Sequence, residues 1–234
     1  MRQPKNGRES FLKSLFLLSF VTGLVDAASV LGMGKVFVAN MTGNVVFMGF
    51  AAVGTPGFRF APLLAALAGF AIGALCAGRV LSRRIAPPRR IDVLLTVEAL
   101  LLFGGAVLSI GYDPASLEPT LRLYSIVIAS AAALGFRTAI VRHLAVADVT
   151  TTVLTMTIAG LAADSSLAGG QSPNRKRRIA SILAICAGAA AGAGLFLHAS
   201  LAVLLTTGGA IVLAAAALAR PSRRGAGTSP APSP

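Results

Sequence analysis

The sequence predicts an all-α fold, a polytopic bundle of transmembrane helices, and three observations support this class. Hydrophobic residues make up 55% of the 234 residues, and charged residues only 12%. Apolar runs of roughly 20 residues, the length that crosses a bilayer, recur along the chain. The charged residues gather in short segments between these runs. We therefore expect a single transmembrane domain over residues 11–219 and no separate soluble domain.

The formal net charge of +13 would indicate nucleic-acid binding in a soluble protein, but the positions of the charges favour a membrane topology. Most Lys and Arg residues fall in four clusters: 2–13, 79–90, 175–178 and 220–224. Basic loops of membrane proteins stay on the cytoplasmic side. We expect a multi-pass protein of the bacterial inner (plasma) membrane, with both termini in the cytoplasm and no nucleic-acid partner.

Six runs are long and apolar enough to cross the membrane fully: 11–33, 60–82, 91–111, 120–141, 179–198 and 199–219. The first run follows a basic tail, 1–10, which is expected to be cytoplasmic. This start also has the pattern of a signal peptide, although Lys13 and Asp26 interrupt that pattern and a first span explains it as well. The final segment, 220–234, is rich in Pro, Ser and Gly and is expected to be disordered.

Two further runs, 36–54 and 144–163, are interrupted by polar side chains. Such side chains, and any unpaired backbone, are costly in hydrocarbon unless protein or water supplies partners. If the run 36–54 crossed fully, the basic cluster 79–90 would lie outside, against the rule that basic loops stay inside. We therefore expect both runs to be re-entrant segments or broken half-helices.

An internal repeat is expected, with one copy over about 11–111 and the other over about 120–219. Segments 38–48 and 146–156 share five of eleven residues, and Asn40 lies opposite Asp148. Each copy would hold three full spans and one interrupted segment. Because an odd number of crossings inverts the second copy, the expected arrangement is an inverted repeat. Secondary transporters with such repeats place their solute between two discontinuous helices.

Two short elements, Gly23-Leu-Val-Asp26-Ala and Asn40-Met-Thr-Gly-Asn44, resemble those of the bacterial YoaK-like family of integral membrane proteins. The threonine-rich second half and the length of the chain also fit, so the resemblance covers residues 11–219. It implies a polytopic inner-membrane protein, a domain of unknown function with a permease-like character. It implies no substrate.

Nine polar residues are candidate substrate or ion ligands: Asp26, Asn40, Thr42, Asn44, Glu98, Arg137, Asp148, Thr150 and Thr152. Carboxylates inside a membrane bind or relay protons and cations, which favours Asp26 and Glu98 as ion-coupling groups. A helix cap at the interface is an equal alternative for Asp26. Arg137 is a natural ion-pair partner for Asp26, Glu98 or Asp148. For the amide and hydroxyl side chains in this set, the alternative role is to hold neighbouring helices together through hydrogen bonds.

The leading functional hypothesis is a small-solute transporter or permease, coupled to protons or ions, with a central polar site formed by the two discontinuous helices. A non-transporting assembly or sensory partner is the alternative, and a lipid-acting membrane enzyme is a weaker one. The sequence has no nucleophile beside a base, no metal-ligand spacing and no phosphate-binding glycine loop, so we expect no enzyme activity, cofactor or metal. The expected partners are the lipid bilayer and an unknown small solute.

Overall fold

The computed structural model describes residues 5–82, 87–144, 154–171 and 174–219, and these residues form helices joined by short connections. In chain order the elements are α1 (Lys5–Gly32), α2 (Met41–Ala52), α3 (Phe60–Ser82), α4 (Pro87–Leu108), α5 (Thr120–Leu144), α6 (Leu154–Ala163), a 3-10 helix η1 (Ser166–Ala168), α7 (Arg175–His198) and α8 (Leu201–Ala219). The predicted all-α class is confirmed. Residues 5–10 of the expected N-terminal tail instead form the start of α1. The rest of that tail, the C-terminal tail 220–234 and the polar segment 145–153 lie outside the described residues.

Five of these helices are long and apolar enough to cross a membrane: α1 over Leu12–Gly32, α3, α5 over Thr120–His143, α7 and α8. Helix α4 has 22 residues, of which Val93–Leu108 form its apolar part. Helices α2 and α6 have 12 and 10 residues. At about 1.5 Å per residue, neither reaches the roughly 30 Å of a hydrocarbon core. Two short helices therefore lie where the sequence predicted interruptions.

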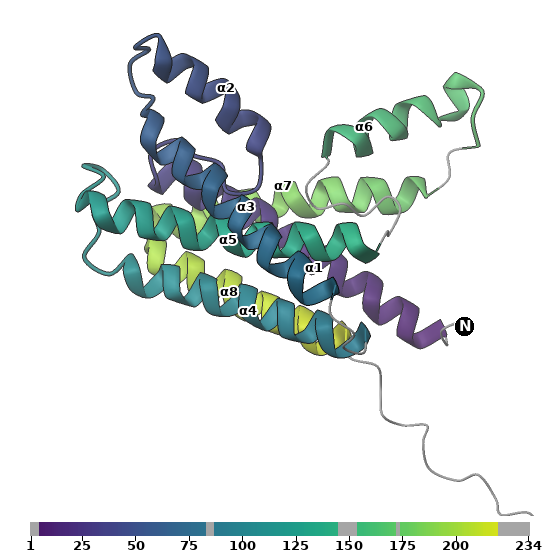
Figure 1. Cartoon of the computed structure of the whole chain (residues 1–234). Helices are drawn as coiled ribbons and strands as arrows, with labels where there is room; N and C mark the ends of the chain where they lie inside the picture. Colours follow the sequence, from purple (N-terminus) through teal and green to yellow (C-terminus); the bar gives the residue numbers. More distant parts are fainter. Residues whose placement is uncertain (1–4, 83–86, 145–153, 172–173, 220–234) are drawn as a thin grey trace, which may run out of the picture.

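The long helices pack in crossed pairs (Figure 1). Helix α1 packs along α7, and α3 packs along α5, while α4 contacts α8; α1 also contacts α8, and α4 contacts α5. Glycines allow the two closest pairs to approach. A Cβ at Gly23 or Gly188 would collide with a carbonyl across the α1–α7 contact, and one at Gly73 or Gly135 would do so across α3–α5. Small residues thus bring the backbones together, as is usual in membrane bundles.

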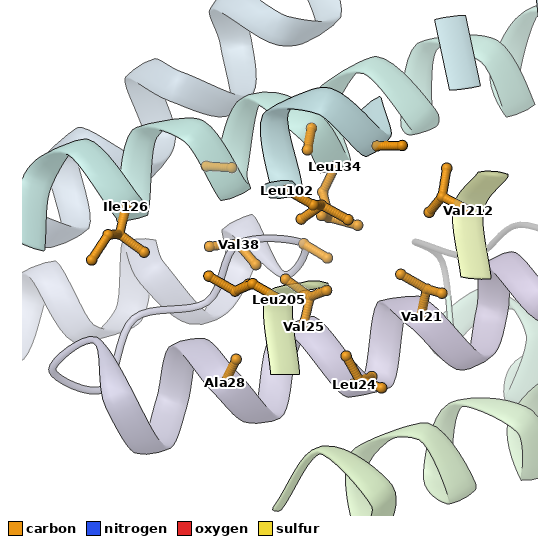
Figure 2. Close-up of a cluster of buried hydrophobic side chains, with 14 of the residues drawn as sticks. Val21, Leu24, Val25, Ala28, Val38, Leu102, Ile126, Leu134, Leu205 and Val212 are labelled. Carbon is orange, nitrogen blue, oxygen red and sulfur yellow. The ribbon is translucent and has the colours of Figure 1, made fainter. Parts of the chain in front are cut away.

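The apolar core lies among α1, α4, α5 and α8 (Figure 2). Figure 2 shows Val25 of α1, Leu102 of α4, Leu134 of α5 and Leu205 of α8 converging, and all four are at most 1% exposed. Val38, from the connection between α1 and α2, enters the same cluster with no exposed surface. The core is therefore built partly from non-helical chain.

That connection, 33–40, turns back into the bundle after α1 ends. Gly34 and Lys35 both have positive φ, at 79° and 60°, which reverses the chain. Ala39 then donates its N–H to Asp26, at 3.1 Å. Asp26 lies six residues before the end of α1, so the returning chain runs about 9 Å back along the helix. Helix α2 starts from this depth and leads away from the bundle (Figure 1).

Candidate functional site

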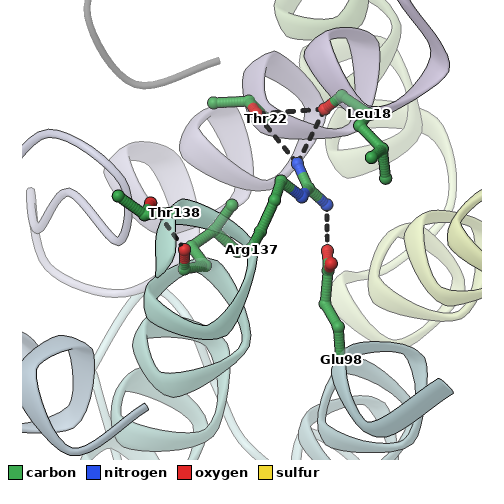
Figure 3. A network of polar contacts seen from close by, with 6 residues as sticks. Leu18, Thr22, Glu98, Arg137 and Thr138 are labelled. Atoms are coloured by element: carbon green, nitrogen blue, oxygen red, sulfur yellow. Dashed lines mark hydrogen bonds and ion pairs between the residues drawn. The ribbon is translucent and has the colours of Figure 1, made fainter. Parts of the chain in front are cut away.

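A buried ion pair in the middle of the bundle connects neighbouring helices (Figure 3). Glu98 of α4 and Arg137 of α5 form a salt bridge, and both side chains are 0% exposed. The Arg137 Nη1 also donates to the backbone carbonyl of Leu18 at 2.7 Å and to the Thr22 hydroxyl at 2.8 Å, both on α1. One guanidinium therefore connects three helices. Of the three partners that the sequence offered for Arg137, Glu98 forms this pair, and Asp148 lies outside the described residues.

The surroundings of this pair are apolar, so each charge depends on the other. Leu94, Leu95 and Leu102 flank Glu98 on α4 and are at most 2% exposed. An isolated charge in such an environment is strongly unfavourable, whereas a paired and hydrogen-bonded one is tolerated. Thr22 is the central residue of the apolar span Leu12–Gly32, so the network lies at mid-depth in α1. Charged groups at this depth in a membrane protein usually have a function.

Three buried polar atoms in this region have no hydrogen-bond partner among the described residues: Glu98 Oε2, Arg137 Nε and Ser130 Oγ. Ser130 lies two turns from Arg137 on α5 and faces Gly105 of α4. Buried polar groups in proteins nearly always have a partner, supplied by protein, water or a ligand. The α4–α5 contact therefore retains unused hydrogen-bonding capacity in the interior.

Asp26 lies one helical turn beyond Thr22 on α1, and residues at this spacing are neighbours on one helix face. Its Oδ1 accepts the N–H of Ala39 at 3.1 Å, and its side chain is half-buried. The structure thus brings Asp26 into the same part of the bundle as Arg137 and Glu98. It also gives Asp26 a structural task, since it holds the returning segment against α1.

The amides of the first polar segment bind their own backbone. Asn44 has no exposed surface, and its side chain pairs with Phe37 in both directions, accepting from its N–H at 2.8 Å and donating to its carbonyl at 2.6 Å. Asn40 caps α2 by accepting the N–H of Gly43 at 3.3 Å. Thr42 is exposed. These bonds supply partners for backbone that would otherwise be unpaired at depth.

The nine predicted site residues thus divide into three groups. Glu98 and Arg137 pair in the interior, with half-buried Asp26 one turn from their partner Thr22, and Asn40, Thr42 and Asn44 gather at the start of α2. The other three, Asp148, Thr150 and Thr152, lie outside the described residues. Thr22 and Ser130 were not among the predicted residues. A signal existed for Thr22, because it precedes Asp26 by one turn.

The two interrupted segments were expected to form a shared central site, and this stays a prediction because residues 145–153 of the second segment lie outside the described residues. The described helices α2 and α6 do not contact each other. Helix α2 packs on α3, and α6 packs on α7 and η1, at opposite ends of the bundle (Figure 1). Each short helix therefore folds back on the long helix that follows it.

The loop between α4 and α5 covers the C-terminal end of α1. The Tyr112 hydroxyl donates to the carbonyl of Gly32 at 3.0 Å, and burial raises the pKa of Tyr112 to about 12. In the same loop, hydrogen bonds from the Ser116 hydroxyl and from the N–H groups of Ala115 and Ser116 hold the pKa of Asp113 below its usual range. Both groups lie outside the apolar spans. No metal-ligand cluster occurs in the ranges that the structure describes.

These features define a polytopic α-helical transmembrane protein with a buried charged network. Residues 14–218 match the family described as "Protein of unknown function (DUF1275)", and the chain belongs to this family. It is 32% identical over 154 residues to the UPF0700 transmembrane protein YoaK of Bacillus subtilis (strain 168). That match covers 65% of this chain and 66% of the relative, just under two thirds of its length. The resemblance to the YoaK-like family is confirmed, and no solved structure matches.

Proposed function

We propose that the protein is a small-solute permease, without enzymatic activity, whose solute or coupling ion binds at the polar network in the interior. The observation that carries this proposal is the buried Glu98–Arg137 pair with its unpaired oxygen and nitrogen atoms. A purely structural pair would be expected to use those atoms on neighbouring groups. Their availability beside the non-helical segment 33–40 favours a binding role.

The charge balance favours a cationic coupling species. Asp26 and Glu98 contribute two carboxylates to this part of the bundle, and Arg137 contributes one guanidinium. A proton or a monovalent cation would neutralise the remaining negative charge. In this proposal Asp26 exchanges the proton or cation, because it is only half-buried, and Arg137 holds Glu98 ready for a polar solute.

The fold is proposed to be an inverted repeat, with α1–α4 as one copy and α5–α8 as the other. The helix contacts support this, because each contact has a counterpart when the copies are exchanged: α1–α7 corresponds to α3–α5, and α1–α8 corresponds to α4–α5. The contact of α4 with α8 corresponds to itself. The positions of α2 and α6 at opposite ends of the bundle also agree with an inversion (Figure 1).

The glycine contacts give the proposed register. Gly23 of α1 faces Ile185 and Ala189, while Gly135 of α5 faces Phe70 and Ala74. This supports the equivalence of Gly23 and Gly135. By the same criterion Gly188 of α7 is equivalent to Gly73 of α3, because Gly188 faces Phe20 of α1 and Gly73 faces Ala132 of α5. An alignment of Gly188 with Gly78, which the sequences around Cys76 and Cys186 favour, is not supported by these contacts.

The topology proposal places both termini and the basic clusters in the cytoplasm of the inner membrane, with 33–59 returning to the outer side. It is tested by labelling single cysteines from outside the cell, after Cys76 and Cys186 are replaced by alanine. Lys35→Cys and Thr55→Cys flank α2 and should both react. Reaction of only one of them would mean that this segment crosses the membrane.

Transport is tested in liposomes that contain the full chain and a pH-sensitive dye. Panels of amino acids, sugars and inorganic ions are applied under an imposed membrane potential, and proton entry and solute uptake are recorded. Wild-type protein should give uptake of at least one solute, and Asp26→Asn and Glu98→Gln should abolish it. Glu118→Gln, which removes a carboxylate from the loop between α4 and α5, is the matched control. Normal flux in both interior variants, with normal folding, would refute the site.

A well-folded wild-type protein that moves no solute, and that copurifies with another membrane protein, would instead favour the assembly or sensory role. In that case the interior pair would be a structural element that fixes three helices. Turnover of a lipid by the purified protein would favour an enzyme.

A further inference from the structure

The end of the bundle formed by α6, η1 and the start of α7 contains an open apolar cleft of about 620 Å³. Its apolar walls include Ile158 and Leu161 of α6 and Ile179 of α7, and Arg175 lies on its rim. Leu167 of η1 borders it and is 99% exposed. A leucine whose side chain is almost fully exposed indicates that the surroundings of the cleft are apolar rather than aqueous.

At the short helix of the first half of the chain, α2, aromatic rings pack against one another. Phe47 of α2 lies 5.7 Å from Phe37 and 4.8 Å from Phe58, measured between ring centroids. The ammonium group of Lys35 lies 5.1 Å from the Phe58 centroid. Residues 154–179 contain no aromatic residue. The α6–α7 hairpin therefore lacks side chains of its own large enough to close the cleft.

The charge around the cleft selects the class of occupant. Residues 154–179 hold four Lys and Arg residues and one Asp, a net charge of +3. Arg178 is bound to Asp164 at 2.7 Å, and this salt bridge connects α6 with α7. Arg175 and Lys176 are exposed at the N-terminus of α7. A cationic rim beside an apolar wall complements a ligand with an anionic head and a hydrocarbon tail.

We propose that this cleft binds one anionic phospholipid. Its phosphate lies at Arg175 and Lys176, where the start of α7 also favours negative charge, and one acyl chain lies along Ile158, Leu161 and Ile179. The C-terminal segment of the chain itself is an unsuitable occupant, because residues 220–224 carry three arginines and no acid. This site is separate from the interior network and does not depend on transport.

The test uses the full chain in detergent, with bound lipid counted by native mass spectrometry during titration with phosphatidylglycerol or phosphatidylcholine. Wild-type protein should retain one phosphatidylglycerol at concentrations where phosphatidylcholine is not retained. The double variant Arg175→Gln/Lys176→Gln should bind phosphatidylglycerol about 30-fold more weakly, from the usual contribution of two basic side chains. Arg79→Gln/Arg142→Gln is the matched control, removing two exposed charges at the ends of α3 and α5, and it should bind normally.

Two further measurements locate the ligand. Leu161→Trp keeps every charge but places a larger side chain in the cleft, so it should also weaken phosphatidylglycerol binding. Inorganic phosphate at millimolar concentration should not displace the lipid if the acyl chain contributes. Equal retention of both lipids, equal losses in the two double variants, normal binding by Leu161→Trp, or full displacement by phosphate would each overturn the proposal. So would a lipid-free dimer that Leu161→Trp dissociates, since a second copy would then cover the cleft.

Discussion

Replacing Glu98 with glutamine tests the energetic meaning of the buried pair most directly. The substitution keeps the size of the side chain and removes its negative charge. Arg137 cannot lose its proton, so a full positive charge remains in the interior with neutral acceptors alone: the Leu18 carbonyl, the Thr22 hydroxyl and the amide oxygen of the new side chain. Breaking a buried pair in this way typically costs about 3–5 kcal/mol.

This loss is large compared with the stability of a typical domain, about 5–15 kcal/mol. For a chain of this size it corresponds to a decrease in melting temperature of about 6–20 °C. The assay is thermal unfolding in mild detergent, followed as loss of the monodisperse peak in size-exclusion chromatography. Glu118→Gln removes an exposed carboxylate that accepts the Thr120 N–H, a bond that the glutamine oxygen can still accept, and should lower the free energy of unfolding by no more than about 1 kcal/mol.

The double variant Glu98→Leu/Arg137→Met separates charge pairing from packing. Apolar residues of similar volume can replace a buried pair with no loss of stability. The double variant should therefore melt near the wild-type temperature, although each single substitution destabilises the protein. Additive losses in the double variant, or a loss below about 1 kcal/mol for Glu98→Gln, would refute the reasoning. If the permease proposal holds, the refolded double variant should still be inactive in transport.

Three further predictions concern other parts of the structure. Asn44→Ala removes both hydrogen bonds to Phe37 and should destabilise the protein by about 2–4 kcal/mol in the same thermal assay. Thr42→Ala, at an exposed position, should have little effect. Equal effects of the two substitutions would contradict the assigned role of Asn44. Gly23→Ala and Gly73→Ala each place a Cβ against a backbone carbonyl and should lower the free energy of unfolding by about 1–3 kcal/mol. A Cβ at Gly78 meets nothing within 4 Å, so Gly78→Ala should be neutral or stabilising. A Gly73→Ala protein as stable as the wild type would mean that α3 and α5 pack less closely. Because the pKa of Asp113 is lowered in the folded state, its contribution to loop stability is complete above the ordinary pKa of 3.8 and is lost as the pH falls through the lowered value. The protection factors of the Ala115 and Ser116 amides, which compare each exchange rate with the intrinsic rate at the same pH, should therefore fall on acidification. Asp113→Asn should remove this pH dependence.

Much of the fold could be predicted because membrane insertion depends on local composition. Five of the six runs predicted as full spans correspond to helices that are long and apolar enough to cross a membrane, and the run 60–82 coincides with α3. The sixth run, 91–111, corresponds to α4, whose apolar part is shorter, Val93–Leu108. The two interrupted segments were located by polar residues inside apolar runs, since such residues weaken insertion wherever they occur. Both segments contain short helices in the described structure.

The candidate site was less predictable because it depends on which helices meet and at what height. Sequence reasoning left Arg137 with three possible partners, and the contact between α4 and α5 selected Glu98. Asn40 and Asn44 were predicted as ligands from their residue type, but their hydrogen bonds go to the backbone of residues 37 and 43. The chain reversal at residues 34–35 brings these side chains to their backbone partners, and hydrophobic periodicity in the sequence does not predict such a reversal.

The sequence by itself determined the membrane class, the positions of the apolar helices and the two places where polar residues interrupt apolar runs. Hydropathy and charge are local quantities, and the bilayer acts on each segment separately. Only the tertiary structure decided that Glu98, Arg137 and Thr22 form one network and that α2 and α6 remain apart. Those relations depend on contacts between distant segments, and they are fixed when glycine contacts such as Gly23 with Ile185 set how closely the helices approach.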